Sequence, residues 1–200
     1  MARRLGLLGL AALGYLLGAL TISLAQSVTI QDSISISESV SGVPSSVTRM
    51  HGVLTLTVHA PTGELLSQQV MPNAWPAAGE AYLVDVWRGL QPFSNARYHG
   101  LGSSATAFAE SQTGCVSEIT TAYTPDNVRA TGTLAVGATP SVFKSVGLNV
   151  IDQPGVTIRE FCLMTNANVG QGTVIARVLL TPFAAPLGST ITTTYLVTIE

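Results

Sequence analysis

The hydrophobic pattern of the chain begins with a regular alternation over residues 27–41, "SVTIQDSISISESVS". Asp32 and Glu38 interrupt the apolar face of this segment. A period of two residues is typical of a strand and not of a helix. The stretch ends in "SGVPSS", whose residues favour a linker. Residues 27–48 are therefore predicted to form an extended β arm and linker. The apolar positions of the arm are Val28, Ile30, Ile34, Ile36 and Val40.

From residue 49 onward, short apolar runs alternate with turn residues. "GVLTLTVHAPTGELLSQQV" holds two such runs, joined by Pro61, Thr62 and Gly63 in a favourable hairpin connection. Later runs rich in Val, Ile and Thr are "VRATGTLAV", "SVFKSVGLNVI", "VTIREFCLMT", "TVIARVLLTPF" and "ITTTYLVTIE". Gly, Pro, Asn or Asp residues bound them. This pattern predicts a mainly β domain over residues 49–200, an antiparallel β-sandwich of the jelly-roll or immunoglobulin-like type with one short helix.

The helix is predicted over residues 76–88, within "PAAGEAYLVDVWRG". Pro76 suits the first turn of a helix, and Gly89 suits the position after its last turn. Apolar residues recur at spacings of three and four, which places them on one face that should pack under a sheet. These residues are Tyr82, Leu83, Val86, Trp87 and Leu90.

Residues 1–26 read as a targeting segment. Arg3 and Arg4 precede an uncharged run, and Ser23-Leu24-Ala25 has the small-x-small form of a processing site. A secretory signal peptide is the first interpretation. An uncleaved membrane anchor is the alternative, because the uncharged run reaches the ~20 residues that span a bilayer. The protein is thus expected to be exported to the cell surface or the extracellular space, with membrane contact only through this segment if it is retained.

Composition narrows the class of protein. Charged residues make up 10% of the chain and hydrophobic residues 46%. Nine Lys and Arg stand against eleven Asp and Glu, which leaves no basic field for nucleic acid. A chain of this kind relies on Ser, Thr, Asn, Gln and Gly for solubility, as β-rich extracellular and virion proteins do. We therefore expect protein partners and no nucleic acid.

The sequence offers few groups for catalysis or metal binding. His51, His59 and His99 lie in no metal-binding motif and are each predicted to be surface or turn imidazoles. "YHGLGSS" lacks the lysine and spacing of a phosphate loop and predicts a tight turn. The neighbouring charges Arg159 and Glu160 are interpreted as solvated or interface groups. The other carboxylates considered are scattered singly: Asp85, Glu110, Glu118, Asp126 and Asp152. We expect no enzymatic activity, no cofactor and no metal site.

The chain has two cysteines, Cys115 and Cys162. In an exported protein they would form one disulfide, whereas the alternative is a pair of buried free thiols. The residue pattern leaves both alternatives open.

Residues 73–200 resemble a class of small phage- and prophage-encoded virion proteins. These proteins share an ordered set of motifs: an "N-A-G" helix, "YIGLGTGTT-A", "DTAL-SEI", "VTE-GLF-A-GGTLLAR" and a final strand such as "LTVTYTLTI". The matching segments here are "NAWPAAGEAYLVDVWRG", "YHGLGSSATAFAESQTGCVSEITTAYTP", "VTIREFCLMTNANVGQGTVIARVLLTPF" and "ITTTYLVTIE". His99, Cys115 and Cys162 depart from the pattern, and the leader and arm lie outside the resemblance. The resemblance implies a virion structural protein.

Two functions from different classes follow. The first is a non-enzymatic virion subunit of a capsid, cement or tail, which self-associates and contacts other virion proteins by β-strand addition of the arm. The alternative is a secreted cell-surface or filament subunit that uses the same arm as a donor strand. A weaker alternative is a carbohydrate-binding β-sandwich, with sugars stacked on aromatic side chains. Those side chains would be Trp75, Trp87, Tyr98 and Tyr123, of which Trp87 is expected to lie in the core instead.

Overall fold

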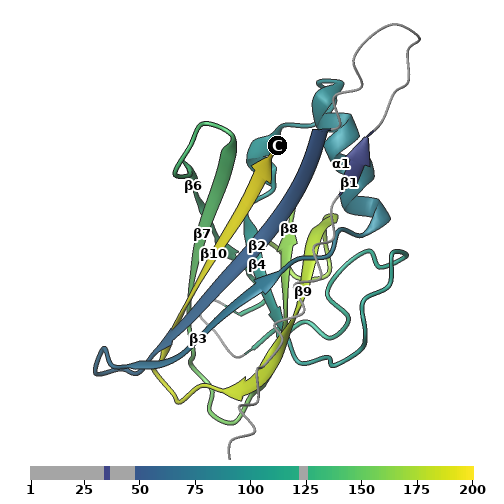
Figure 1. Cartoon of the computed structure of the whole chain (residues 1–200). Helices are drawn as coiled ribbons and strands as arrows, with labels where there is room; N and C mark the ends of the chain where they lie inside the picture. Colours follow the sequence, from purple (N-terminus) through teal and green to yellow (C-terminus); the bar gives the residue numbers. More distant parts are fainter. Residues whose placement is uncertain (1–33, 37–47, 122–125) are drawn as a thin grey trace, which may run out of the picture.

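The structure, a computed structural model, describes residues 34–36, 48–121 and 126–200. They form a mainly β domain in which two antiparallel sheets pack against each other with one short helix (Figure 1). The large sheet contains β1 (Ile34–Ile36), β2 (Thr48–His59), β3 (Leu65–Pro72), β6 (Thr133–Val136), β7 (Val142–Val150) and β10 (Thr190–Ile199). The small sheet contains β4 (Tyr98–Gly102), β5 (Ala130–Thr131), β8 (Thr157–Met164) and β9 (Val174–Ala184). The predicted β-sandwich is confirmed.

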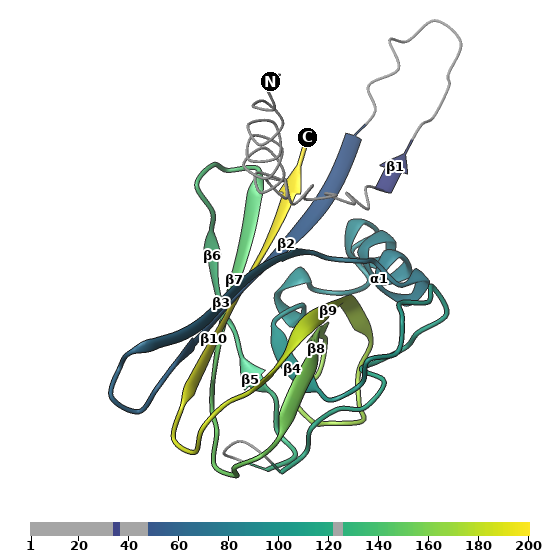
Figure 2. The same cartoon turned by 60° about the horizontal axis from the view of Figure 1, so that its bottom comes forward.

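Strand order follows from the antiparallel pairings. The large sheet runs β1-β2-β10-β7-β6, with β3 also paired to β2, and the small sheet runs β5-β4-β8-β9. The hairpin predicted at Pro61 to Gly63 joins β2 to β3, and Gly63 has the positive φ of 87° that such a turn requires. In Figure 2 the small sheet and the helix α1 (Ala77–Trp87) lie on one side of the large sheet.

The core lies between the sheets and follows from the period-two pattern. Leu54, Leu56 and Val58 of β2 point inward, as their alternating burial shows. Phe161 of β8 stacks on Tyr195 of β10 with ring centroids 6.1 Å apart, which joins the two sheets. Burial of one such large apolar side chain contributes about 1.5–3 kcal/mol. The inward positions thus supply most of the stabilisation.

Helix α1 packs against β9 through a narrower face than predicted. Tyr82 and Leu83 are buried, and Val86 is partly buried against the core. Trp87, however, is 57% exposed and Leu90 is 65% exposed. The prediction that Trp87 lies in the core is therefore wrong. The reason is Gly79, where an added Cβ would lie 2.3 Å from the backbone oxygen of Ile175.

Because Gly79 sits against the β9 backbone, the contact face of α1 is centred on positions i, i+3, i+4 and i+7 counted from it. At 100° per residue Trp87 lies roughly 90° away from the middle of that face. Past the helix, the Tyr82 hydroxyl donates a hydrogen bond to the Pro92 carbonyl at 2.7 Å. Burial raises the pKa of Tyr82. A 3-10 turn, η1 (Phe93–Asn95), then leads into β4.

Part of the predicted arm forms β1 and pairs with β2 of the same chain. The register places Ile34 opposite Met50, Ser35 opposite Arg49 and Ile36 opposite Thr48. The arm positions Val28, Ile30 and Val40, like the leader over residues 1–26, lie outside the described residues. None of the helices in the described part of the chain is long and apolar enough to span a membrane.

The edge of β9 is occupied by a side chain. Gln69 of β3 donates from Nε2 to the Thr181 carbonyl at 2.9 Å and accepts from the Thr181 amide at 2.9 Å. One side-chain amide thus satisfies the N–H and the C=O that Thr181 would otherwise present at a strand edge. It also ties the two sheets together at this end of the sandwich.

Candidate functional site

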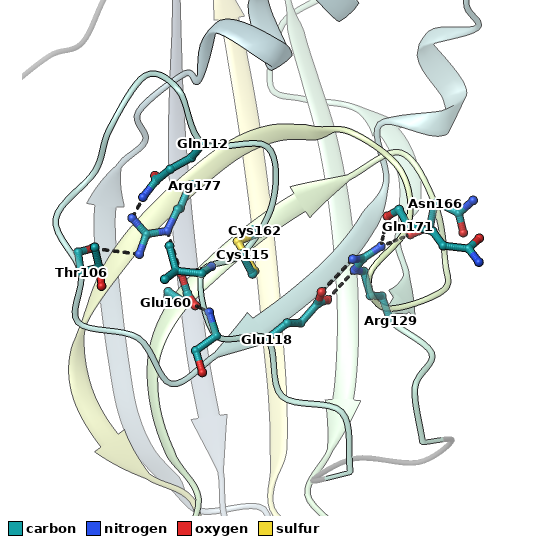
Figure 3. The surroundings of a disulfide bond; sticks show 12 residues. Thr106, Gln112, Cys115, Glu118, Arg129, Glu160, Cys162, Asn166, Gln171 and Arg177 are labelled. Atoms are coloured by element: carbon teal, nitrogen blue, oxygen red, sulfur yellow. Dashed lines mark hydrogen bonds and ion pairs between the residues drawn. A yellow bond between two sulfur atoms is a disulfide. The ribbon is translucent and has the colours of Figure 1, made fainter.

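The long connection between β4 and β5 covers the outer face of the small sheet. Its backbone is tied to itself by a hydrogen bond from the Ser103 amide to the Ser117 carbonyl (2.8 Å). It is tied to the sheet by a bond from the Ile119 amide to the Leu101 carbonyl (2.9 Å). We call residues 103–121 the covering loop. Among the described residues, the disulfide and the buried Arg and Glu side chains lie beneath this loop (Figure 3).

A disulfide joins the covering loop to β8. Cys115 of the loop and Cys162 of the strand are bonded, with their Cα atoms 5.8 Å apart and a sequence separation of 47. Of the two alternatives left open by the sequence, the structure therefore has the disulfide. Cys162 packs with Met164 and Val174 in a small apolar cluster beside it.

A buried ion pair lies next to the disulfide. Arg177 of β9 donates from Nε to Glu160 of β8 at 2.7 Å, and both side chains are fully buried. Glu160 also accepts the backbone amides of Val116 (3.3 Å) and Ser117 (2.8 Å) from the covering loop. The interpretation of Glu160 as a solvated or interface charge is therefore wrong. The covering loop shields this position from solvent.

The remaining donors of Arg177 bind the covering loop as well. Its guanidinium reaches the Thr106 carbonyl at 2.9 Å and the Gln112 side-chain oxygen at 3.1 Å. Gly102 leaves space for the pair, because an added Cβ there would lie 2.3 Å from Glu160 Oε1. Both charges therefore have several hydrogen-bond partners, as buried charges require.

A second ion pair holds the far end of the covering loop. Arg129 donates from Nε and Nη2 to the two carboxylate oxygens of Glu118, which is a bidentate arrangement. Its Nη1 donates to three backbone carbonyls of the β8–β9 connection. These belong to Asn166 (2.6 Å), Asn168 (2.8 Å) and Gln171 (2.9 Å). Arg129 is 2% exposed. Through Arg129, the covering loop is therefore held against the connection between β8 and β9.

His99 lies between the two sheets and not on the surface. It is fully buried on β4, where Nδ1 is 2.6 Å from Thr193 Oγ1 of β10 and Nε2 is 2.7 Å from Ser145 Oγ of β7. Burial lowers its pKa to about 3. The prediction of a surface or turn imidazole is wrong for this residue. The flanking strands make room for the ring, since a Cβ at Gly147 would lie 2.5 Å from His99 Cγ.

The buried polar and charged groups described above are suited to stabilising the fold. His99 and Ser145 form a hydrogen-bonded pair, but both are fully buried, and the other ring nitrogen faces a threonine and not a carboxylate. Cys115, Cys162 and Glu160 offer ligand atoms within 4.8 Å of one another. The two sulfurs are joined to each other, however, and Glu160 is bonded to Arg177. Each of these groups already has its partner inside the domain.

The aromatic residues considered for sugar stacking differ in their exposure to solvent. Trp75 is 4% exposed and belongs to the core, whereas Trp87 is exposed on α1. Tyr98 is partly buried, with the Arg97 guanidinium 5.8 Å from its ring centroid. Tyr123 lies outside the described residues. The structure thus removes Trp75 from the set of stacking candidates.

Sequence reasoning missed both ion pairs. A usable signal was present in "TVIARVLLTPF", where a single charge interrupts an otherwise apolar strand. In a chain with few charges, an arginine at such a position must find a buried acidic partner. The identity of that partner depends on the pairing of β8 with β9, in which Arg177 lies opposite Cys162.

No family model matches the chain, and no curated protein or solved structure matches it either. The function proposed below therefore depends on the sequence and the geometry of this chain.

Proposed function

We propose that the protein is a non-enzymatic structural subunit that self-associates by β-strand addition, as a subunit of a virion capsid, cement layer or tail. The observation that carries the proposal is the pairing of β1 with β2. It identifies the stretch of sheet edge on which an arm segment fits. The order of motifs over residues 73–200 supports the virion class.

Two segments of the same chain pair with this edge of β2, each over a different part of its length. β3 pairs with Val53 to His59, and the Asn73 amide bonds to the Gly52 carbonyl at 3.1 Å. The first residues of β2 extend beyond this cover, and there β1 pairs with Thr48 to Met50. An arm from another copy would make the same main-chain hydrogen bonds in the same register. Exchange of identical elements between copies is a low-cost route to association.

The arm also contributes apolar surface. Val28, Ile30, Ile34, Ile36 and Val40 lie at alternate positions, so one face of an extended arm would carry them all. Full burial of each such side chain contributes about 1.5–3 kcal/mol, against about 1–2 kcal/mol for ordering the backbone of each residue. Docking therefore gains most where the arm meets an apolar groove in a partner.

Directed cross-linking tests strand exchange between copies. Ser35→Cys and Arg49→Cys are made in two separate full-length chains, which are mixed under reducing conditions, transferred to assembly conditions and oxidised. These positions face each other in the β1–β2 register. A disulfide between them can form only between chains, so we expect a dimer band on a non-reducing gel. The control pairs Ser35→Cys with Thr55→Cys, further along β2.

Cysteines at the same two positions in one chain test whether β1 instead pairs within its own domain. In a chain that carries both Ser35→Cys and Arg49→Cys, strand exchange gives linked multimers. A compact cross-linked monomer from this chain, with no dimer from the mixed single variants, would contradict the proposal and make β1 an ordinary strand of its own domain.

The disulfide favours the second candidate function, a secreted cell-surface or filament subunit. Disulfides form and persist in oxidising compartments outside the cytosol. Mass spectrometry of the chain isolated from its particle separates the two candidates. A chain that begins near Gln26 in a filament supports the exported subunit, and a chain that retains Arg3 and Arg4 in a virion supports the virion subunit.

A further inference from the structure

The outward face of the large sheet carries few charges. From His51 onward, Lys144 is the one Lys, Arg, Asp or Glu among the described outward positions of the three long strands, and Glu200, just after β10, lies 3.8 Å from His51 at one end of the face. We call these outward positions the threonine face. Alternating burial and the strand register place on it His51, Val53, Thr55, Thr57 and His59 of β2; Thr190, Thr192, Thr194, Leu196 and Thr198 of β10; and Val142, Lys144, Val146, Leu148 and Val150 of β7.

Side chains at both margins of this face are exposed to solvent. Leu148 is 57% exposed and Val150 is 41% exposed on β7. On the other side Val70 of β3 pairs with Thr55 and is 63% exposed. The solvated face of an antiparallel sheet normally carries polar and charged residues at its outward positions. A contiguous face of threonines and aliphatic residues therefore indicates an interaction surface.

We infer that the threonine face packs against the same face of a second copy of the chain. Each outward residue of a sheet covers roughly 33 Å², given strands about 4.8 Å apart and about 6.7 Å between alternate residues. About eighteen residues, with the outward side of β3 included, give roughly 600 Å² per copy and about 1,200 Å² for two. This area reaches the lower limit of stable, specific interfaces.

The arrangement of residue types fits a two-fold interface between sheets. β10 lies between β2 and β7, so its threonines form the centre, with Thr57 opposite Thr192 and Thr55 opposite Thr194. Their methyl groups can pack and their hydroxyls can pair without leaving a buried charge. Lys144 lies beside Ala135 of the edge strand β6, so its ammonium group can reach solvent at the rim. Face-to-face packing about 10 Å apart then buries the same patch on both copies.

This interface is separate from the proposed strand exchange, because it uses the outward face of the sheet and not the β2 edge. The test is the association constant of the full-length chain, measured by sedimentation velocity over a range of concentrations. Leu148→Asp should weaken association at least about 30-fold, because it places an unpaired charge within the buried patch. The matched control is Leu187→Asp, because Leu187 is 56% exposed and lies outside the threonine face.

A second variant guards against an effect peculiar to Leu148. Thr192→Lys changes the residue directly opposite Leu148, and it should weaken association to a similar extent. Melting temperature and near-ultraviolet circular dichroism verify that each variant is folded. A wild-type chain that stays monomeric, or folded variants that associate as the wild type does, would overturn the inference. The cross-linking result between residues 35 and 49 is read independently, so failure of one interface leaves the other testable.

Discussion

The Arg177 guanidinium and the Glu160 carboxylate meet at 2.7 Å with neither side chain exposed to solvent. Between them they bind the backbone of the covering loop at Thr106, Val116 and Ser117. The pair therefore holds the covering loop on the sheet together with the disulfide. Removing one partner leaves an unpaired charge in a buried site, whereas removing both leaves no unpaired charge but still deprives the loop backbone of these hydrogen bonds.

The first prediction concerns this pair. Arg177→Met should lower the free energy of unfolding by about 3–5 kcal/mol, because Glu160 keeps a buried charge with no counter-ion. The double variant with Glu160→Met should recover part of that loss. Urea unfolding monitored by circular dichroism measures both. Equal destabilisation in the single and double variants would argue against charge burial as the cause.

The second prediction concerns pH. His99 has a pKa lowered to about 3 in the folded protein, whereas the pKa of an unfolded histidine is about 6.5. Between these values the unfolded chain binds the proton and the folded chain does not. Stability should therefore rise with pH through this window, and fall by up to about 1.4 kcal/mol per pH unit as the solution is acidified.

The carboxylates titrate in part of the same window, so the His99 contribution is measured as a difference between proteins. The pH dependence of unfolding of His99→Gln should be shallower than that of the wild type between pH 6 and 4. His59→Gln is the control, because His59 lies on the outward face of β2 and is not buried. Identical slopes for the wild type and His99→Gln would show that this ring does not titrate on unfolding.

The third prediction concerns the disulfide between Cys115 and Cys162. The chain-entropy model gives a stabilisation of about 4 kcal/mol for a closed loop of this length. The double variant Cys115→Ala, Cys162→Ala should lose stabilisation of that order in urea unfolding without added reductant. Thiol labelling of the wild-type protein, unfolded but not reduced, should find no reactive thiol. Two labelled thiols per chain would contradict the bond.

The fourth prediction compares two positions on α1. Leu83→Asp should unfold the domain, since Leu83 is 4% exposed and a carboxylate there has no partner. Trp87→Asp should change the free energy of unfolding by no more than about 0.5 kcal/mol, as an exposed substitution does. Thermal melts of the two variants provide the comparison. A folded Leu83→Asp variant with an unchanged melting temperature would contradict the packing of the helix.

The fold was predictable because its information is local. Alternation along β2, β7 and β10, the turn at Pro61 to Gly63 and the helix ending before Gly89 are each contained within a few residues. The site was less predictable. Glu160 shares its side of β8 with Cys162, a side that faces away from the core, and only the covering loop makes it buried. The burial of His99 likewise depends on β7 and β10, which follow it by many residues.

The prediction that Trp87 lies in the core was wrong because burial on the helix also depends on a neighbouring strand. Spacing along α1 defines an apolar stripe wider than the contact that β9 can make. The position of that contact is set by Gly79, where the helix approaches a strand backbone closely. A sequence pattern reports which residues are apolar, but a glycine-centred contact decides which of them reach the neighbouring strand.

The Gln69 side chain, by satisfying the backbone of Thr181, has a consequence for the geometry of any polymer. At that point β9 cannot template a further strand, so lateral growth through the small sheet is blocked there. In the proposed strand exchange the arm adds to the β2 edge of the large sheet, so each contact joins the donor arm of one copy to the acceptor edge of the next. Contacts of this kind, taken by themselves, are head-to-tail and build a ring or a thread with two unlike ends.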